Sequence, residues 1–163
     1  MRKIKSLVCT GFLFLLMANI NAQLIEKKTI SLELAKKIAS VAEAEAVKNN
    51  WTVAVSIVDD GGNLVYFGKM DNTQIGSVEV SMKKAKTAIY FKRSTKTYEE
   101  RVAGGNNSIL ALPNVVPFEG GLPFVIDGQY IGAIGVSGGS SAQDGVVANA
   151  AVVFLNSLFE KSK

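Results

Sequence analysis

The chain of 163 residues has no histidine, and its only cysteine is Cys9. Histidine is the commonest general base, metal ligand and haem ligand in proteins, so its absence removes the usual form of each. Cys9 lies in an N-terminal segment that we expect to be removed from the mature protein. The mature chain would then have no disulfide, no thiolate nucleophile and no cysteine-bound metal, and we predict no metal site.

Residues 1–22 have the pattern of a secretory signal peptide. Arg2, Lys3 and Lys5 form a basic start, residues 7–17 form an apolar core, and Ala22 precedes a predicted cleavage before Gln23. The apolar core is shorter than the ~20 residues that span a bilayer. We predict an exported protein, periplasmic or extracellular, with no transmembrane span after cleavage. An uncleaved N-terminal anchor is the alternative.

Charge gives no indication of nucleic-acid binding. The whole chain has 18 Lys and Arg against 14 Asp and Glu, but three of the basic residues and no acid lie in residues 1–22. The mature chain therefore has 15 basic against 14 acidic residues, a net charge of +1. We expect no nucleic-acid partner. Residues 23–163 suit a single domain with its own core.

Short apolar and β-branched runs alternate with helical patterns along the mature chain. Strands are predicted at 52–58, 64–70, 122–126 and 130–136, with a further short strand at 109–112. Helices are predicted at 31–49, 74–92, 95–102 and 141–160, the first of them capped by Ser31. Because successive strands are joined by tight turns, we predict an α+β fold. It would have one antiparallel sheet of about five strands with helices on both sides.

The stretch 119–139 contains the strongest hairpin signal and a run of glycines. Asp127-Gly128 separates two apolar runs, as in a two-residue turn with positive φ. Gly132, Gly135 and Gly138 do not match a nucleotide-binding motif, and we interpret them as sites of close helix packing. The loop 138–141 before the last helix could hold an anion at the helix N-terminus, or it could be only a capped start formed by Ser141 and Asp144.

Lys84 lies on the predicted helix 74–92, beside a strip of small residues. An apolar stripe on the same helix, Ile75 to Ile89 at spacings of three and four, is predicted to face the core. The preferred interpretation of Lys84 is a solvated lysine; the alternative is that its small neighbours let it reach a ligand anion. Met70, Met82, the four tyrosines and the lysines are the axial haem ligands that the chain could offer, and none stands out.

Several stretches together resemble the GlcG/HbpS family of haem-binding-like proteins, also called DUF336. Apart from residues 31–46, the matching stretches are 57–64 (IVDDGGNL), 69–71 (KMD), 84–88 (KAKTA), 120–123 (GGLP), 127–128 (DG), 131–138 (IGAIGVSG) and 143–144 (QD). The resemblance implies an antiparallel α+β fold and self-assembly into dimers or larger oligomers. In this family some secreted members bind haem or sense redox stress, and others are associated with glycolate metabolism. The resemblance therefore implies functions of these kinds. The chain departs from the family pattern at Gly145, where an acid is common, at Lys69, where arginine is common, and in lacking histidine.

Three hypotheses about function follow. The first is an exported protein that binds a small molecule, with haem or another tetrapyrrole as the possible cofactor, or that takes part in redox sensing. Its predicted binding residues are Lys84, Pro117, Phe118, Gly120, Gly121, Ser140 and Asp144. The second is a metal-independent enzyme acting on a small organic acid, with Lys84 or Asp144 as acid or base. The third is a structural homo-oligomer that binds a protein partner through the apolar residues 146–154.

Overall fold

The computed structural model describes residues 25–160; the predicted signal peptide, with Cys9, and residues 161–163 lie outside this range. The described part contains an antiparallel sheet of four strands in the order β2-β1-β4-β3. The strands are β1 (Ala54–Asp59), β2 (Leu64–Lys69), β3 (Gly121–Ile126) and β4 (Gln129–Ser137). The predicted α+β class is therefore confirmed.

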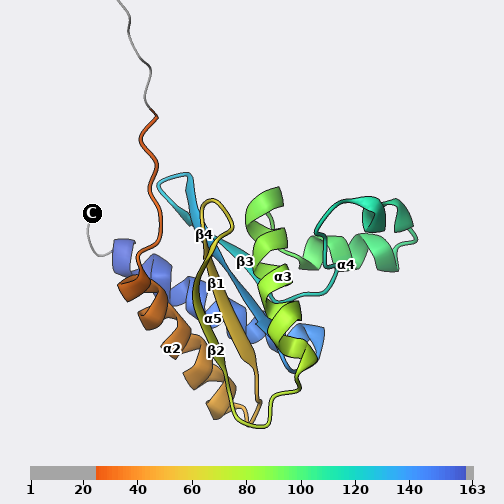
Figure 1. Cartoon of the computed structure of the whole chain (residues 1–163), viewed down its shortest axis with the longest axis horizontal. Coiled ribbons are helices and arrows are strands. Elements are labelled where there is room, and N and C mark those ends of the chain that lie inside the picture. The colour runs from red at the N-terminus through yellow and green to blue at the C-terminus, as the bar shows by residue number, and fades with distance from the viewer. Residues whose placement is uncertain (1–24, 161–163) are drawn as a thin grey trace, which may run out of the picture.

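Helices cover both faces of this sheet (Figure 1). Helices α2 (Leu32–Lys48) and α5 (Ser141–Glu160) pack side by side against one face, and α3 (Gly76–Phe91) lies on the other. The short helix α4 (Lys96–Ala103) and the 3-10 helix η2 (Asn107–Ala111) extend to one side. The larger core lies between the sheet and the pair α2 and α5, and it includes Ile38, Ile57, Ile134 and Leu155.

The segment 109–112 was predicted as a strand, but residues 109–111 belong to η2 and Leu112 is its C-cap. Ser108 Oγ donates a hydrogen bond of 2.6 Å to Asn106 Oδ1 at the start of this turn. Local side-chain bonds of this kind compete with extended structure. The segment also pairs with no strand of the four-stranded sheet, so its backbone has no neighbouring strand to stabilise an extended conformation.

Two local signals, the Ser31 cap and the Asp127-Gly128 turn, are confirmed. Ser31 Oγ accepts a hydrogen bond of 3.2 Å from Leu34 N and caps α2. Asp127 and Gly128 have φ values of 50° and 75°, as the two-residue turn between β3 and β4 requires. These signals depend on only a few neighbouring residues, and tertiary packing does not override them.

The buried face of α3 is shifted around the helix from the predicted apolar stripe: Ala85 and Ile89 of that stripe are buried, but Val78 and Met82 are only half-buried. The strip of small residues that includes Ser77, Ser81 and Ala88 is also buried, whereas Ile75 is 87 % exposed. The cause is Gly135 on β4: a Cβ there would overlap the Ser81 carbonyl oxygen and lie 2.5 Å from Ala85 N. Only small residues allow the helix backbone to come this close, and this approach carries Lys84 into the interior.

Helix α5 is long and apolar enough to cross a bilayer, judged by its length and composition alone. It packs on the sheet and α2 through Val147, Ala148, Ala151 and Leu155, which are fully buried. Core helices of globular domains pass the same test, and the packing of α5 is of that kind.

Candidate functional site

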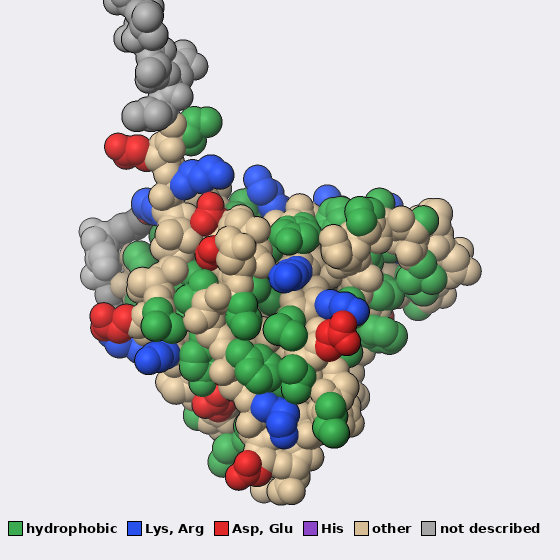
Figure 2. Space-filling model, in the orientation of Figure 1, with side chains coloured by type: hydrophobic (Ala, Val, Ile, Leu, Met, Phe, Trp, Pro, Cys, Tyr) green, Lys and Arg blue, Asp and Glu red, His purple; other side chains and the backbone are tan. Residues whose placement is uncertain are grey.

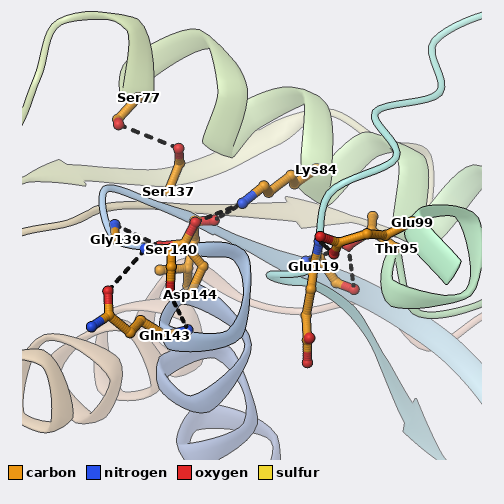
Figure 3. A network of polar contacts seen from close by, with 12 residues as sticks. Ser77, Lys84, Thr95, Glu99, Glu119, Ser137, Gly139, Ser140, Gln143 and Asp144 are labelled. Carbon is orange, nitrogen blue, oxygen red and sulfur yellow. Dashed lines mark hydrogen bonds and ion pairs between the residues drawn. The ribbon is translucent and has the colours of Figure 1, made fainter. Parts of the chain in front are cut away.

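Lys84 and Asp144 form a buried ion pair between α3 and the first turn of α5 (Figure 3). Lys84 Nζ lies 2.7 Å from Asp144 Oδ2, and each residue is 2 % exposed. The ammonium also donates a hydrogen bond of 3.0 Å to the Val136 carbonyl oxygen at the end of β4. The interpretation of Lys84 as a solvated lysine is therefore wrong. Its anion partner is a side chain of the same protein.

Asp144 occupies the place where the sequence indicated an anion cradle. Its Oδ1 accepts a hydrogen bond of 2.9 Å from Gly139 N, in the loop that opens α5. Ser140 N donates to Gln143 Oε1 at 2.9 Å, and Gln143 N donates to Ser140 Oγ at 3.4 Å. The capping box is thus formed by Ser140 and Gln143 instead of Ser141 and Asp144. The N–H groups of Gly139 and Ser140 already have partners, so the chain itself fills the cradle.

The ionisation of Asp144 reflects two opposing effects. Burial raises the pKa of this carboxyl above its ordinary value, because water no longer stabilises the charged form. The Lys84 ammonium and the backbone N–H of Gly139 favour the charged form and lower the pKa, but by less. The pair is a tightly packed link between α3, β4 and α5. A substrate could reach its charged atoms only if the covering backbone moved.

The covering backbone is Gly120 and Gly121, at the start of β3. A Cβ on Gly120 would lie 3.0 Å from Lys84 Nζ and 2.8 Å from Asp144 Cβ, and a Cβ on Gly121 would lie 2.5 Å from the Lys84 carbonyl oxygen. Gly120 also has a φ of 122°, in a region that side chains rarely adopt. Both glycines are needed to close the chain over the ion pair.

Of the seven predicted site residues, the structure brings four together in the interior: Lys84, Asp144, Gly120 and Gly121. Ser140 is an exposed helix cap, Pro117 is half-buried, and Phe118 is 53 % exposed and lies on the surface. The residues thus form a buried polar link with an exposed apolar side chain near it. Their role in ligand binding stays a prediction.

Sequence reasoning missed Thr95, which is fully buried and fixes the covering strand. Thr95 N donates to the Gly121 carbonyl oxygen at 3.0 Å, and Thr95 Oγ1 accepts from Gly121 N at 2.9 Å. Glu99 was also missed; its carboxylate accepts a hydrogen bond of 2.6 Å from Glu119 N. Thr95 makes no side-chain capping bond to α4, and no local sequence signal pointed to these long-range bonds.

The described residues contain no cluster of three or more His, Cys, Asp or Glu side chains that could hold a metal ion. The candidate axial ligands are separated: Met70 contacts the main core, whereas Met82 lies half-buried on α3 and Tyr90 is exposed on the same helix. The structure therefore offers single weak donors, and no preformed set of iron ligands is present among residues 25–160.

The model of the family described as haem degrading protein HbpS-like matches residues 30–153. The chain belongs to this HbpS-like family. Protein GlcG of Escherichia coli K12 is 43 % identical over 111 residues, which are 68 % of this chain and 83 % of GlcG. These findings confirm the resemblance derived from the sequence.

Two solved structures show the same fold as this chain. Klebsiella pneumoniae protein ORFY, assigned to DUF336, has a TM-score of 0.78 and 31 % identity, covering 85 % of this chain and 98 % of ORFY. A complex of PduOC with haem has a TM-score of 0.71 and 31 % identity, covering 77 % of this chain and 94 % of PduOC.

One departure of this HbpS-like chain from the family pattern has a structural explanation. A Cβ on Gly145, in the first turn of α5, would overlap the Glu119 carboxylate. Glu119 in turn lies 3.2 Å from Lys96 Nζ. The absence of a side chain at position 145 lets Glu119 lie across the start of α5, beside the segment that covers the ion pair.

Proposed function

We propose that this protein binds haem or a related tetrapyrrole. The main support is the structural likeness to PduOC, which covers 77 % of this chain. PduOC has been solved as a complex with haem. Membership of the HbpS-like family supports the same ligand class. A bound haem would supply redox chemistry and light absorption, and the chain would supply the binding surface.

The surface that suits such a ligand lies on the segment 110–118 and the adjoining part of α3. The segment carries three exposed apolar side chains: Leu110, Leu112 and Phe118. The segment is attached to α3 through Thr87, whose Oγ1 lies 2.7 Å from the Asn114 carbonyl oxygen and accepts a hydrogen bond of 3.1 Å from Val116 N. An apolar macrocycle is stabilised by contact with such side chains.

Basic side chains lie near this surface, and tetrapyrroles such as haem carry carboxylates. Lys83 and Lys86 are on α3, beside Thr87, and Lys96 is at the start of α4. Figure 2 shows apolar and basic side chains intermixed on the face that carries α3. The described residues lack histidine and cysteine, so we infer that binding depends on apolar contact and on lysine–carboxylate pairs more than on iron ligation.

Replacing Phe118 by Ala should weaken haemin binding about tenfold, because it removes an exposed aromatic contact worth ~1–2 kcal/mol. The measurement is a titration of the chain beginning at Gln23, followed by the Soret absorbance. Phe159→Ala is the matched control, since Phe159 is 39 % exposed at the far end of α5 and should leave the affinity unchanged. Equal affinities in all three proteins would contradict this placement of the site.

We also propose that the protein is exported and self-assembles through the outer face of α5. Val146 and Val153 are 47 % and 57 % exposed and lie seven residues apart, on one side of the helix. Exposed apolar faces of this kind are typical of subunit interfaces. The N-terminal signal pattern supports export.

Native mass spectrometry of the protein recovered from its producing cells tests both parts of this proposal. The subunit mass should correspond to a chain that begins at Gln23, and the complex should contain at least two subunits. Val153→Lys should shift the complex to monomer, because it places a charge in the apolar contact. A subunit that begins at Met1, or a wild-type monomer at micromolar concentration, would contradict the corresponding part.

A further inference from the structure

A cavity of about 430 Å³ lies at the end of the sheet that carries the β3–β4 turn. Its walls come from four separate parts of the chain: residues 25–28, Asp60 in the β1–β2 turn, the end of α3, and residues 128–130. The volume is within the range of small-molecule sites. The cavity shares no residue with the 110–118 surface or the Lys84–Asp144 pair, so it is independent of the proposed tetrapyrrole site.

The cavity combines an apolar wall with a cation that has no acidic partner. Ile89, which is buried, and the half-buried Tyr130 contribute the apolar wall, together with Ile25. Lys92 Nζ lies 5.2 Å from the centroid of the Tyr130 ring. Within residues 25–160 no carboxylate lies within 4.0 Å of Lys92 Nζ. Lys92 is therefore in contact with the ring and in no ion pair, although the carboxylates of Glu26 and Asp60 also line the cavity.

The position of Lys92 is held by the backbone. Lys92 is the C-cap residue of α3, and its backbone is in the left-handed conformation with a φ of 54°. Its carbonyl oxygen accepts a hydrogen bond of 3.2 Å from Tyr130 Oη. A second ammonium at the cavity, that of Lys27, is 3.9 Å from Asp60 and largely exposed, so it is only weakly paired. A carboxylate entering the cavity would meet two cations without breaking a strong ion pair.

We propose that this cavity binds a small aromatic carboxylate. Its ring would lie against Ile89 and Tyr130, and its carboxylate would lie at the ammonium groups of Lys92 and Lys27. The apolar wall selects a flat ring, and the free ammonium selects an anion over a neutral molecule of the same shape.

Titration of the ¹⁵N-labelled chain beginning at Gln23 with benzoate tests this proposal by NMR. Benzoate should shift the amide signals of Gly128, Gln129 and Tyr130 with saturation, and the neutral isostere benzamide should bind at least about tenfold more weakly. Lys92→Met, which keeps the length of the side chain, should weaken benzoate binding about tenfold or more. Lys37→Met, an exposed lysine of α2 outside the cavity, should not change it.

Lys27→Met provides an independent check, because residue 27 lies outside every helix and strand and its substitution should not perturb folding. It should also weaken benzoate binding. A linear or absent shift, equal binding of benzamide, or unchanged affinity in both Lys92→Met and Lys27→Met would overturn the proposal. None of these results depends on whether the protein binds a tetrapyrrole.

Discussion

Lys84→Met should destabilise the folded chain by about 3–5 kcal/mol, because it leaves the Asp144 carboxylate buried without its cation. Lys84 and Asp144 are each 2 % exposed, so solvent cannot replace the lost partner. The free energy of unfolding is measured by urea denaturation at pH 7. The control is Lys83→Met, whose exposed pair with Glu79 should contribute less than about 1 kcal/mol.

The double variant Lys84→Met/Asp144→Asn should recover a large part of this loss. Asparagine keeps an oxygen that can accept the Gly139 N–H but carries no charge to be left unpaired. The cycle of single and double variants then gives the coupling between the two side chains. If the two single variants lower stability independently and their effects add, the ion pair does not have the role assigned to it.

The cost of Lys84→Met should also depend on pH. Burial already raises the pKa of Asp144, so this carboxyl binds its proton more tightly in the folded state than in the unfolded chain. Loss of Lys84 removes an interaction that lowers this pKa, and the pKa should rise further. The destabilisation should therefore be small near pH 4, where the carboxyl is protonated, and should grow as pH rises toward 7. The opposite trend would contradict a buried carboxylate at this position.

Gly135→Ala should destabilise the fold by about 3 kcal/mol or more, or should prevent folding. The added Cβ would overlap the Ser81 carbonyl oxygen and approach Ala85 N, and both are backbone atoms of α3. A backbone cannot change rotamer to make room, so the helix would have to move off the sheet. Its movement would also disturb the Lys84–Asp144 pair. Circular dichroism during thermal unfolding measures the effect.

Gly76→Ala is the matched control for this substitution. A Cβ on Gly76, the first residue of α3, would meet no atom within 4 Å. Alanine is also a better helix former than glycine, so this variant should be neutral or slightly more stable. A melting temperature of Gly135→Ala equal to that of Gly76→Ala would show that α3 does not depend on close contact at β4.

Features encoded by short stretches could be predicted from the sequence. The Asp127-Gly128 turn and the Ser31 cap each depend on a few adjacent residues, and the alternation of strands and helices follows from local periodicity. The antiparallel sheet follows from the tight turns, because a short connection allows no other arrangement.

The face of α3 could not be predicted, because the decisive residue lies on another element. The apolar stripe of α3 is a normal core signal, and Ala85 and Ile89 do face the sheet, but Gly135 also allows the small-residue strip to come close to it, which leaves Ile75 exposed. The error about Lys84 follows from this one. A lysine is usually exposed, and the shift of the buried face toward the small-residue strip brings Lys84 to Asp144.

The candidate site could be predicted only in part. Lys84, Gly120, Gly121 and Asp144 do lie together, but they bind one another instead of forming an open cradle. At the start of a helix, side chains of the first turn can accept hydrogen bonds from the free backbone N–H groups. Gln143 and Asp144 do so here, and they leave the N–H groups of Ser140 and Gly139 unavailable to a ligand. Local sequence does not show which of these bonds form.

NMR mapping with iron-free protoporphyrin IX would show whether the 110–118 surface binds a tetrapyrrole without a histidine ligand. Saturable changes in the amide signals should gather in residues 110–118 and on the exposed part of α3, and the affinity should lie within about tenfold of that for haemin. No saturable change would contradict the claim. Changes confined to residues 128–130 would also contradict it, because they would place the tetrapyrrole in the cavity at the other end of β4.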